Sequence, residues 1–197
     1  MNLEAGELSR KAPYIEMFIS SVLSLVASLV LAVEAFRLAS NPNAVFSCDI
    51  NAIISCGKVA KTWQSQLLGF PNAYLGLISE PIVLTIAIAG IAGVFFPRWM
   101  MRAAQIMYGV GLALAWWLFT QSYFVIGAFC PWCLLITVAT TSVFASMTRV
   151  NIIEKNLPLS EKVQIRAERA LRLWIDHFIV IMLVAVIALM ISTKYLI

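Results

Sequence analysis

Charged residues are scarce in this chain: Asp, Glu, Lys and Arg make up 12% of its 197 residues, against about 25% in ordinary soluble domains. Hydrophobic residues make up 61%, and the mean hydropathy is +0.90. This composition excludes a soluble domain. Histidine is nearly absent, and its single example, His177, disfavours a Ser-His or Cys-His catalytic pair, because such a pair needs an imidazole base. We expect His177 to be an interfacial residue.

Long apolar runs, in contrast, fill much of the chain. About 20 apolar residues in a helix cross the roughly 30 Å hydrocarbon core of a bilayer. Five runs of this kind lie near residues 15–36, 73–96, 103–125, 130–148 and 174–193. They are continuous and lack the alternation of a membrane barrel. The sequence therefore predicts an all-α polytopic membrane bundle, with too little remaining chain for a soluble catalytic domain of about 100 residues.

The positions of Lys and Arg predict the orientation of this bundle. If the N-terminus is cytoplasmic, ten of the 14 basic residues lie inside and four outside, as the positive-inside tendency favours. The inside residues are Arg10, Lys11, Arg98, Arg102, Arg149, Lys155, Lys162, Arg166, Arg169 and Arg172, and the outside residues are Arg37, Lys58, Lys61 and Lys194. The net charge of +4 thus comes from basic residues that flank the membrane spans, and it does not indicate a nucleic-acid partner.

We expect four parts along the chain. The first apolar run, about 22 residues long, exceeds the roughly 7–15 of a secretory signal, so we expect a retained helix. In the third part, Pro158 and Ser160 are turn and helix-start signals. The parts are a cytoplasmic tail over residues 1–14, a four-helix core over 15–148, a basic cytoplasmic connection over 149–173 and a fifth transmembrane helix over 174–197.

The core contains a long outward loop over residues 38–72. Between Gly57 and Leu68 the apolar side chains fall within about 100° of helical arc, which predicts one short interfacial helix. About twelve residues at 1.5 Å each are too short to span a bilayer. We expect this helix to form a lid across the mouth of the bundle, with Trp63 at the headgroup level.

Cysteines occur as two pairs, Cys48 with Cys56 in the outward loop and Cys130 with Cys133 at the start of the fourth run. The expected topology places both pairs at the same outer surface, where paired cysteines are disulfide candidates. A bridge across two residues closes a tiny loop and constrains little of the unfolded chain, so the second pair suits chemistry better than stability. The two pairs together predict a redox site.

The local sequence of the second pair favours a reactive sulfur. Pro131 is tolerated in a first helical turn, which would place Cys133 where unpaired amides and the helix dipole stabilise a thiolate. Exchange between two cysteine pairs passes two electrons through mixed disulfides without a metal. The acceptor we expect is a lipid-soluble quinone that reaches the bundle from the bilayer.

Alternatives remain open at this point. Each pair taken singly could be a loop staple or packing residues, in a non-enzymatic membrane scaffold or a transporter. Four cysteines could also bind zinc, because C-x2-C is a common ligand spacing. Against a transporter, the sequence shows no paired repeats. The redox interpretation is preferred because it accounts for both pairs at once.

Four motifs form a specific set in this chain. They are Cys48-Asp49 through Ser55-Cys56 with seven residues between the cysteines, Thr62 six residues after Cys56, Asn72 and Gly76 in an N-x-x-x-G start to the second run, and Cys130-Pro131-Trp132-Cys133. With this set, residues 15–148 resemble the vitamin K epoxide reductase family, specifically its bacterial members that act like DsbB. The resemblance implies a four-helix bundle around a quinone, with the fifth helix peripheral, in a bacterial inner membrane.

The resemblance also implies a role for each cysteine. Cys133 would lie next to the ring of the quinone, menaquinone or ubiquinone. Cys130 would resolve Cys133 and exchange with Cys56, and Cys48 would meet the thiol of the partner. No thioredoxin-like domain follows the bundle, so we expect the partner to be a separate DsbA-like thioredoxin-fold protein.

Three further residues are expected to line the quinone site. By the resemblance, Asn72 hydrogen-bonds a quinone carbonyl, and Thr62 either supports the lid helix or is a simple polar position. Thr137 stands four residues after Cys133, where animal members carry a Tyr at the ligand. This difference, together with Pro131-Trp132, disfavours the alternative reaction, the reduction of a quinone or vitamin K epoxide by thiols.

Glu80 has no role implied by the resemblance. Carboxylates inside a membrane are costly and face the bundle interior with a function or a partner. Two interpretations stay open: Glu80 relays protons to a reduced quinone, or it is a neutral side chain hydrogen-bonded to a neighbouring helix.

Overall fold

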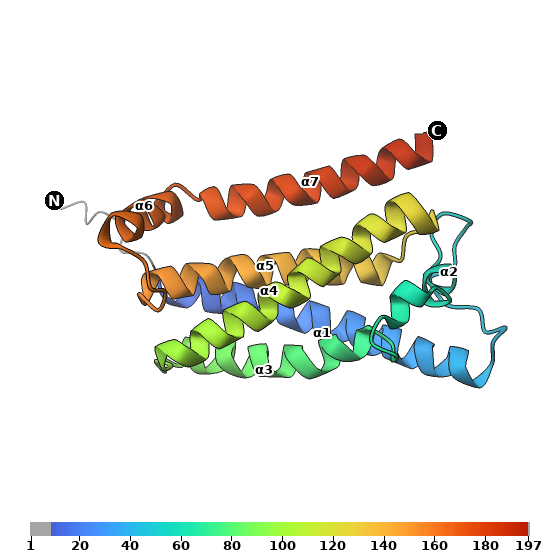
Figure 1. Ribbon diagram of the computed structural model, residues 1–197, viewed down its shortest axis with the longest axis horizontal. Coiled ribbons are helices and arrows are strands. Elements are labelled where there is room, and N and C mark those ends of the chain that lie inside the picture. The colour runs from blue at the N-terminus through green and yellow to red at the C-terminus, as the bar shows by residue number, and fades with distance from the viewer. Residues whose placement is uncertain (1–8, 197) are drawn as a thin grey trace.

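The computed structural model describes residues 9–196, and their fold is all-α (Figure 1). Residues 1–8 of the expected tail lie outside the described residues. The helices are α1 (Lys11–Ser40), α2 (Cys56–Ala60), η1 (Trp63–Gln66), α3 (Ala73–Ile91), α4 (Arg98–Gln121), η2 (Ser122–Ile126), α5 (Pro131–Ile153), α6 (Glu161–Arg172) and α7 (Ile175–Leu196).

Five of these segments are long and apolar enough to cross a membrane, which confirms the predicted polytopic bundle. They are Lys11–Ser40, Ala73–Ile91, Arg98–Ile126, Pro131–Ile153 and Ile175–Lys194. The second span ends earlier than the apolar run, because the chain turns at Gly93, which has φ +97°. The third begins directly after Pro97, because proline is tolerated where a helix starts.

The lid differs from the single helix expected over residues 57–68. The segment contains two short helices, α2 and η1, separated by Thr62 in an extended conformation (φ −87°, ψ 153°). The Thr62 hydroxyl donates to the carbonyl of Val59 at 2.7 Å, and the Ser65 hydroxyl donates to the carbonyls of Ala60 and Thr62. These side-chain bonds to the backbone compete with a continuous helix.

Small residues let the first two spanning helices approach closely. A Cβ atom on Gly76 would lie 2.1 Å from the Ser28 hydroxyl oxygen, and one on Gly90 would lie 2.3 Å from the Tyr14 ring. Close approach over small residues is a general way of packing membrane helices. α1 is therefore the central helix, packed against α3 and α5, and α4 packs against α5 (Figure 1).

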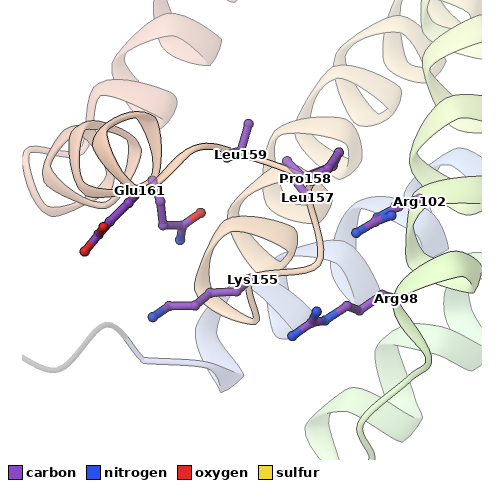
Figure 2. Close-up of a pocket in the computed structure, with 8 residues that line it drawn as sticks. Arg98, Arg102, Lys155, Leu157, Pro158, Leu159 and Glu161 are labelled. Atoms are coloured by element: carbon purple, nitrogen blue, oxygen red, sulfur yellow. The ribbon is translucent and has the colours of Figure 1, made fainter.

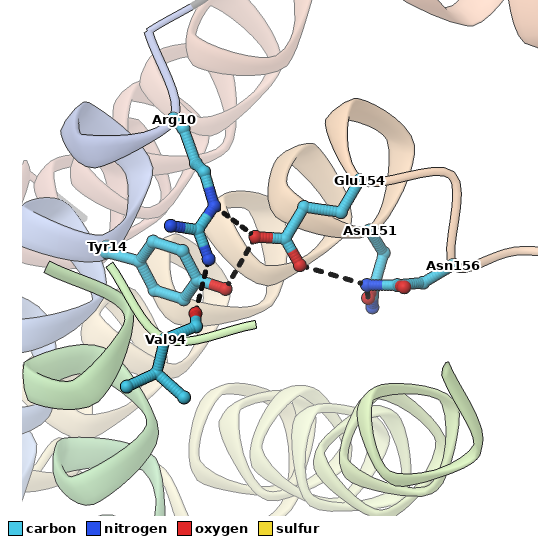
Figure 3. Close-up of polar contacts among 6 residues, drawn as sticks. All are labelled: Arg10, Tyr14, Val94, Asn151, Glu154 and Asn156. Atoms are coloured by element: carbon cyan, nitrogen blue, oxygen red, sulfur yellow. Dashed lines mark hydrogen bonds and ion pairs between the residues drawn. The ribbon is translucent and has the colours of Figure 1, made fainter. Parts of the chain in front are cut away.

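Polar contacts tie the helices together at the end of the bundle that carries the N-terminus (Figure 3). The Glu154 carboxylate accepts hydrogen bonds from Arg10 at 2.6 Å and from the Tyr14 hydroxyl at 3.1 Å. Arg10 also donates to the carbonyl of Val94. Asn156 donates to Glu154 and to Asn151. The start of α1, the turn after α3 and the end of α5 are thus joined through Arg10.

The fifth span, α7, lies at the periphery as expected (Figure 1). At one end, Arg149 on α5 pairs with Asp176 at 2.9 Å, and His177 lies 3.3 Å from Glu16 of α1. At the other end, the Lys194 ammonium donates to the carbonyl of Tyr123. His177 thus makes polar contacts with Glu16 and Arg149 at a helix end.

Candidate redox site

The first cysteine pair forms a disulfide in the loop between α1 and α2. Cys48 and Cys56 are bridged, with 5.7 Å between their Cα atoms. The Asp49 carboxylate lies at the centre of this loop and accepts hydrogen bonds from the amides of Phe46 and Gly57 and from the Ser55 hydroxyl, at 2.8–2.9 Å. One carboxylate therefore holds both ends of the disulfide loop.

The start of α2 explains why Cys56 occupies its position. Ser55 is the N-cap of α2, and its hydroxyl oxygen accepts from the amide of Lys58 at 3.0 Å. Such capping makes Cys56 the first helical residue. A Cβ atom on Gly57 would lie 2.7 Å from Asp49 Oδ2, so only glycine lets the carboxylate reach the backbone here.

The hydrogen bonds to Asp49 stabilise its charged form, so the folded loop depends on an ionised carboxylate. Burial raises the pKa of Asp49, but the bonds from Gly57, Phe46 and Ser55 outweigh it and hold the pKa below its ordinary value of 3.8. A carboxylate with a lowered pKa stabilises the folded loop fully above its ordinary pKa, and this contribution is lost as the pH falls through the lowered value.

We expect Asp49→Ala to loosen the disulfide loop. Charge-assisted hydrogen bonds of this kind contribute enough that their loss raises local opening about tenfold. Hydrogen exchange at the amides of Phe46 and Gly57 measures this opening. Asn43→Ala, an exposed change at the start of the same loop, is the control and leaves both amides protected. Unchanged protection in Asp49→Ala would show that the disulfide alone holds the loop.

A short backbone bridge joins the loop to the turn before α5. Ile54 and Phe129 form a parallel β-bridge, in which Phe129 donates to the carbonyl of Ile53 at 2.6 Å and Ser55 donates to the carbonyl of Phe129 at 3.0 Å. Cys56 directly follows Ser55, and Cys130 directly follows Phe129. The bridge therefore brings the two pairs together at one end of the bundle.

The sulfurs share one buried cluster. Its buried members are Phe46, Cys48, Cys56 and Cys130, and Cys133 packs against them. Cys56 and Cys130 are 1% and 2% exposed, whereas Cys133 is partly exposed. The Cys48–Cys56 disulfide leaves two free thiols, which is not the arrangement of a four-cysteine zinc site.

The start of α5 stabilises a thiolate, but at Cys130 rather than at the expected Cys133. Cys130 is the N-cap, and its sulfur accepts from the amide of Cys133 at 3.3 Å. The Cys133 thiol lowers the pKa of Cys130 most; burial opposes this effect, and the amides of Cys133 and Trp132 add to it. The reason for the difference is geometric, because first-turn amides point to the N-cap side chain and not to the residue that carries them.

The three residues expected to contact a quinone differ in the hydrogen-bonding groups that they leave free. The Asn72 amide nitrogen donates to the carbonyl of Gln64 at 2.7 Å, which leaves one of its two N–H groups. The Thr62 hydroxyl donates to Val59 and supports the lid. Thr137 is buried, and its hydroxyl donates to the carbonyl of Cys133 at 2.9 Å. Asn72 is thus the one of the three with a donor to spare.

Two features of the redox site were not predicted from the sequence: the contact between two tryptophan rings and the role of the Asp49 carboxylate. The rings of Trp63 on η1 and Trp117 on α4 lie 6.0 Å apart and connect the lid to the bundle. The role of Asp49 depends on partners up to eight residues away, which hydropathy does not indicate. The serine before Cys56 is an N-cap signal that predicts the start of α2.

Comparison with known proteins agrees with this geometry. A search of the curated proteins finds no match to the chain. The model of the vitamin K epoxide reductase family matches residues 15–148, which include both cysteine pairs, the lid and the four packed spans. Because this match covers more than half of the sequence, the chain belongs to the vitamin K epoxide reductase family and is a multi-pass membrane oxidoreductase.

Proposed function

We propose that this protein reoxidises a DsbA-like thioredoxin-fold partner and passes two electrons to menaquinone or ubiquinone. The observation that carries the proposal is the bridge between Ile54 and Phe129, which brings the loop disulfide and the Cys130-Cys133 pair into one buried cluster. Proteins of this family use quinones and generally work with thioredoxin-like partners. The two pairs then form a two-step path from the partner to the bilayer.

The first exchange takes place at the loop disulfide. A partner thiolate attacks Cys48, the Cys48–Cys56 bond breaks, and Cys56 leaves as a thiolate. The second partner thiol then displaces Cys48, which yields the oxidised partner and two reduced loop cysteines. Cys48 is 7% exposed, whereas its neighbours Val45 and Ile50 are 80% and 71% exposed. Attack on Cys48 thus requires the partner to bind this apolar tip and displace it.

The second exchange moves the electrons inward. Cys56 attacks Cys130 of an oxidised Cys130–Cys133 pair, Cys133 leaves, and Cys48 then displaces Cys130 to restore the loop disulfide. The lowered pKa of Cys130 makes it a good leaving group in this last step. A Cys48–Cys56 disulfide beside free thiols at Cys130 and Cys133 is the arrangement that this exchange would leave behind.

Two observations support a quinone, a flat ring that carries carbonyl groups, as the acceptor. Cys133 is partly exposed, and Asn72 holds one unused N–H donor for a carbonyl oxygen. A bound quinone would take up two electrons and two protons. The chain would orient it with Asn72, with Thr62 supporting the lid and Thr137 shaping the wall below Cys133.

We further propose that the redox end faces the extracytoplasmic side of a bacterial inner membrane. The charge distribution supports this orientation: α6 and the turn after α3 are basic and lie at the opposite end of the bundle from the cysteines (Figure 1). Basic residues favour the cytoplasmic side. An oxidising outer side is also where a loop disulfide persists.

Reconstitution of the full chain in lipid nanodiscs with a reduced DsbA-like protein tests the proposal. Quinone absorbance and free partner thiols are followed with menaquinone and ubiquinone analogues. We expect one quinone reduced for every two partner thiols lost. No quinone reduction with any analogue, while the partner thiols stay reduced, would refute it. Thiol-driven reduction of a quinone epoxide but not of the quinone would establish the alternative reaction.

A further inference from the structure

A pocket of about 420 Å³ opens at the end of the bundle opposite the cysteines (Figure 2). It lies between the start of α4 and the loop that connects α5 to α6. The residues that line it include Arg98, Arg102, Lys155, Leu159, Glu161 and Gln164. α5 separates it from Cys130 by 23 helical residues, which is about 35 Å. The pocket is thus independent of the redox site.

Three cations converge on this pocket. Arg98 and Arg102 are four residues apart on the same face of α4 and point toward the loop, and Lys155 follows the end of α5 (Figure 2). Like charges at this helical spacing repel each other. Lys155 also has φ +52°, a conformation that favours glycine over lysine. The chain thus concentrates positive charge here at some cost in stability.

These cations lack acidic partners in the described part of the chain. Arg10 and Arg149 at the same end pair with Glu154 and Asp176. Arg98 and Lys155, in contrast, form no ion pair with any residue between 9 and 196, and Arg102 donates only to the carbonyl of Asn156. This arrangement leaves positive charge for a ligand from outside the chain.

The single carboxylate in the wall does not neutralise them. Glu161 begins α6, and Figure 2 shows its carboxylate directed away from Arg98 and Arg102. Gln164, in the same wall, donates to the carbonyl of Ile152 and to Glu168, so it braces α6 against α5. The pocket therefore presents its arginines and its lysine to an anion.

The surroundings of the pocket match a lipid rather than a free anion. Arg98 is the first residue of one candidate span, and Lys155 lies two residues after the end of another. Residues at the ends of spans are expected at the depth of the lipid headgroups. Trp99, Leu159 and Val163 beside them are 71%, 37% and 44% exposed. α6 carries Lys162, Arg166 and Arg169 as well as exposed apolar residues, which is the pattern of an interfacial helix. Apolar surface for acyl chains thus adjoins the charged pocket.

We propose that Arg98, Arg102 and Lys155 bind the phosphodiester group of an anionic phospholipid, with its acyl chains along Trp99 and Leu159. Basic pockets beside membrane spans are suited to such headgroups. The lipid would join α4 to the α5–α6 loop. We therefore expect the lipid to stay bound when the protein is extracted from a membrane with mild detergent.

Native mass spectrometry of the full chain tests the proposal directly. The protein is reconstituted in nanodiscs of equal parts phosphatidylglycerol and phosphatidylcholine and then extracted with mild detergent. We expect one retained phosphatidylglycerol per chain. Equal retention of the two lipids would overturn the proposal without the need for any variant.

Paired charge-neutral variants locate the site. Arg98→Gln with Lys155→Gln is expected to weaken phosphatidylglycerol retention roughly twentyfold. Lys162→Gln with Arg166→Gln removes the same charge from α6 outside the pocket and is the matched control, with little loss expected. Equal loss in both variants would show general attraction to the surface and not a site. Thermal unfolding in detergent checks that both variants remain folded.

Inorganic phosphate separates a lipid site from a free-anion site. At millimolar concentration it is expected to leave the retained phosphatidylglycerol in place, because it lacks acyl chains to bind the apolar surface. Displacement of the lipid by phosphate at this concentration would overturn the lipid assignment.

Discussion

Cys133→Ser is expected to oxidise at most one equivalent of reduced partner and then stop. The loop disulfide remains and can accept one pair of electrons, but the inner pair can no longer form a disulfide to carry them onward. Steady-state quinone reduction should fall by about a thousandfold or more, as on loss of other essential nucleophiles. Counting partner disulfides per protein molecule with time measures the burst.

The same experiment distinguishes an enzyme from a scaffold. Cys130→Ser is expected to give the same burst, because only the loop disulfide is consumed. The reduced Cys48 then attacks the oxidised partner in the reverse direction and releases one partner thiol, so part of the protein is held as a mixed disulfide between Cys48 and the partner. Gel electrophoresis without reductant detects it. A membrane scaffold with structural disulfides would show neither a burst nor a mixed disulfide, and continued turnover in either variant would remove the inner pair from the path.

Glu80→Ala is expected to destabilise the bundle by about 2–4 kcal/mol. Glu80 is 2% exposed, and its Oε1 accepts from the hydroxyls of Ser24 on α1 and Tyr108 on α4, at 2.8 and 2.9 Å. Removing the carboxyl group leaves a cavity and two buried hydroxyl groups without their acceptor. Unfolding of the purified protein in mild detergent gives the change in free energy.

Glu80→Gln separates the structural role from a proton relay. The amide oxygen still accepts from Ser24 and Tyr108, so we expect its stability to stay within about 1 kcal/mol of the unchanged protein. The contacts from two neighbouring helices favour a hydrogen-bonded tether for Glu80. Unchanged quinone reduction by Glu80→Gln across pH would exclude the relay, whereas an altered pH profile at unchanged stability would establish it.

Hydropathy was sufficient to predict the spans because each one must be apolar over a length set by the bilayer. The sequence predicts that the two cysteine pairs meet, because the expected topology places both pairs on the same side of the membrane. The division of the lid into two helices was not predictable, because it depends on hydrogen bonds from the Thr62 and Ser65 hydroxyls to backbone carbonyls. The spacing of apolar side chains shows which face of a helix is apolar. It does not show where side-chain hydroxyls compete for the backbone carbonyls.

Two features of the site depend on contacts that no local pattern contains. Asp49 holds the loop through Gly57, eight residues away, and Ile54 meets Phe129 across two spanning helices. The thiolate was assigned to Cys133 because that residue lies in the first turn. In the structure it is Cys130 whose pKa is lowered, because the N-cap sulfur accepts the hydrogen bond from the Cys133 amide and the sulfur in the first turn does not.

The exchange between Cys56 and Cys130 is the step on which the account depends. In a variant with Cys48→Ala and Cys133→Ala only these two cysteines remain, and mild oxidation followed by non-reducing peptide mapping shows whether they join. We predict an intramolecular Cys56–Cys130 disulfide in nearly every molecule. Two thiols that both stay open to alkylation after oxidation would contradict electron transfer between the pairs.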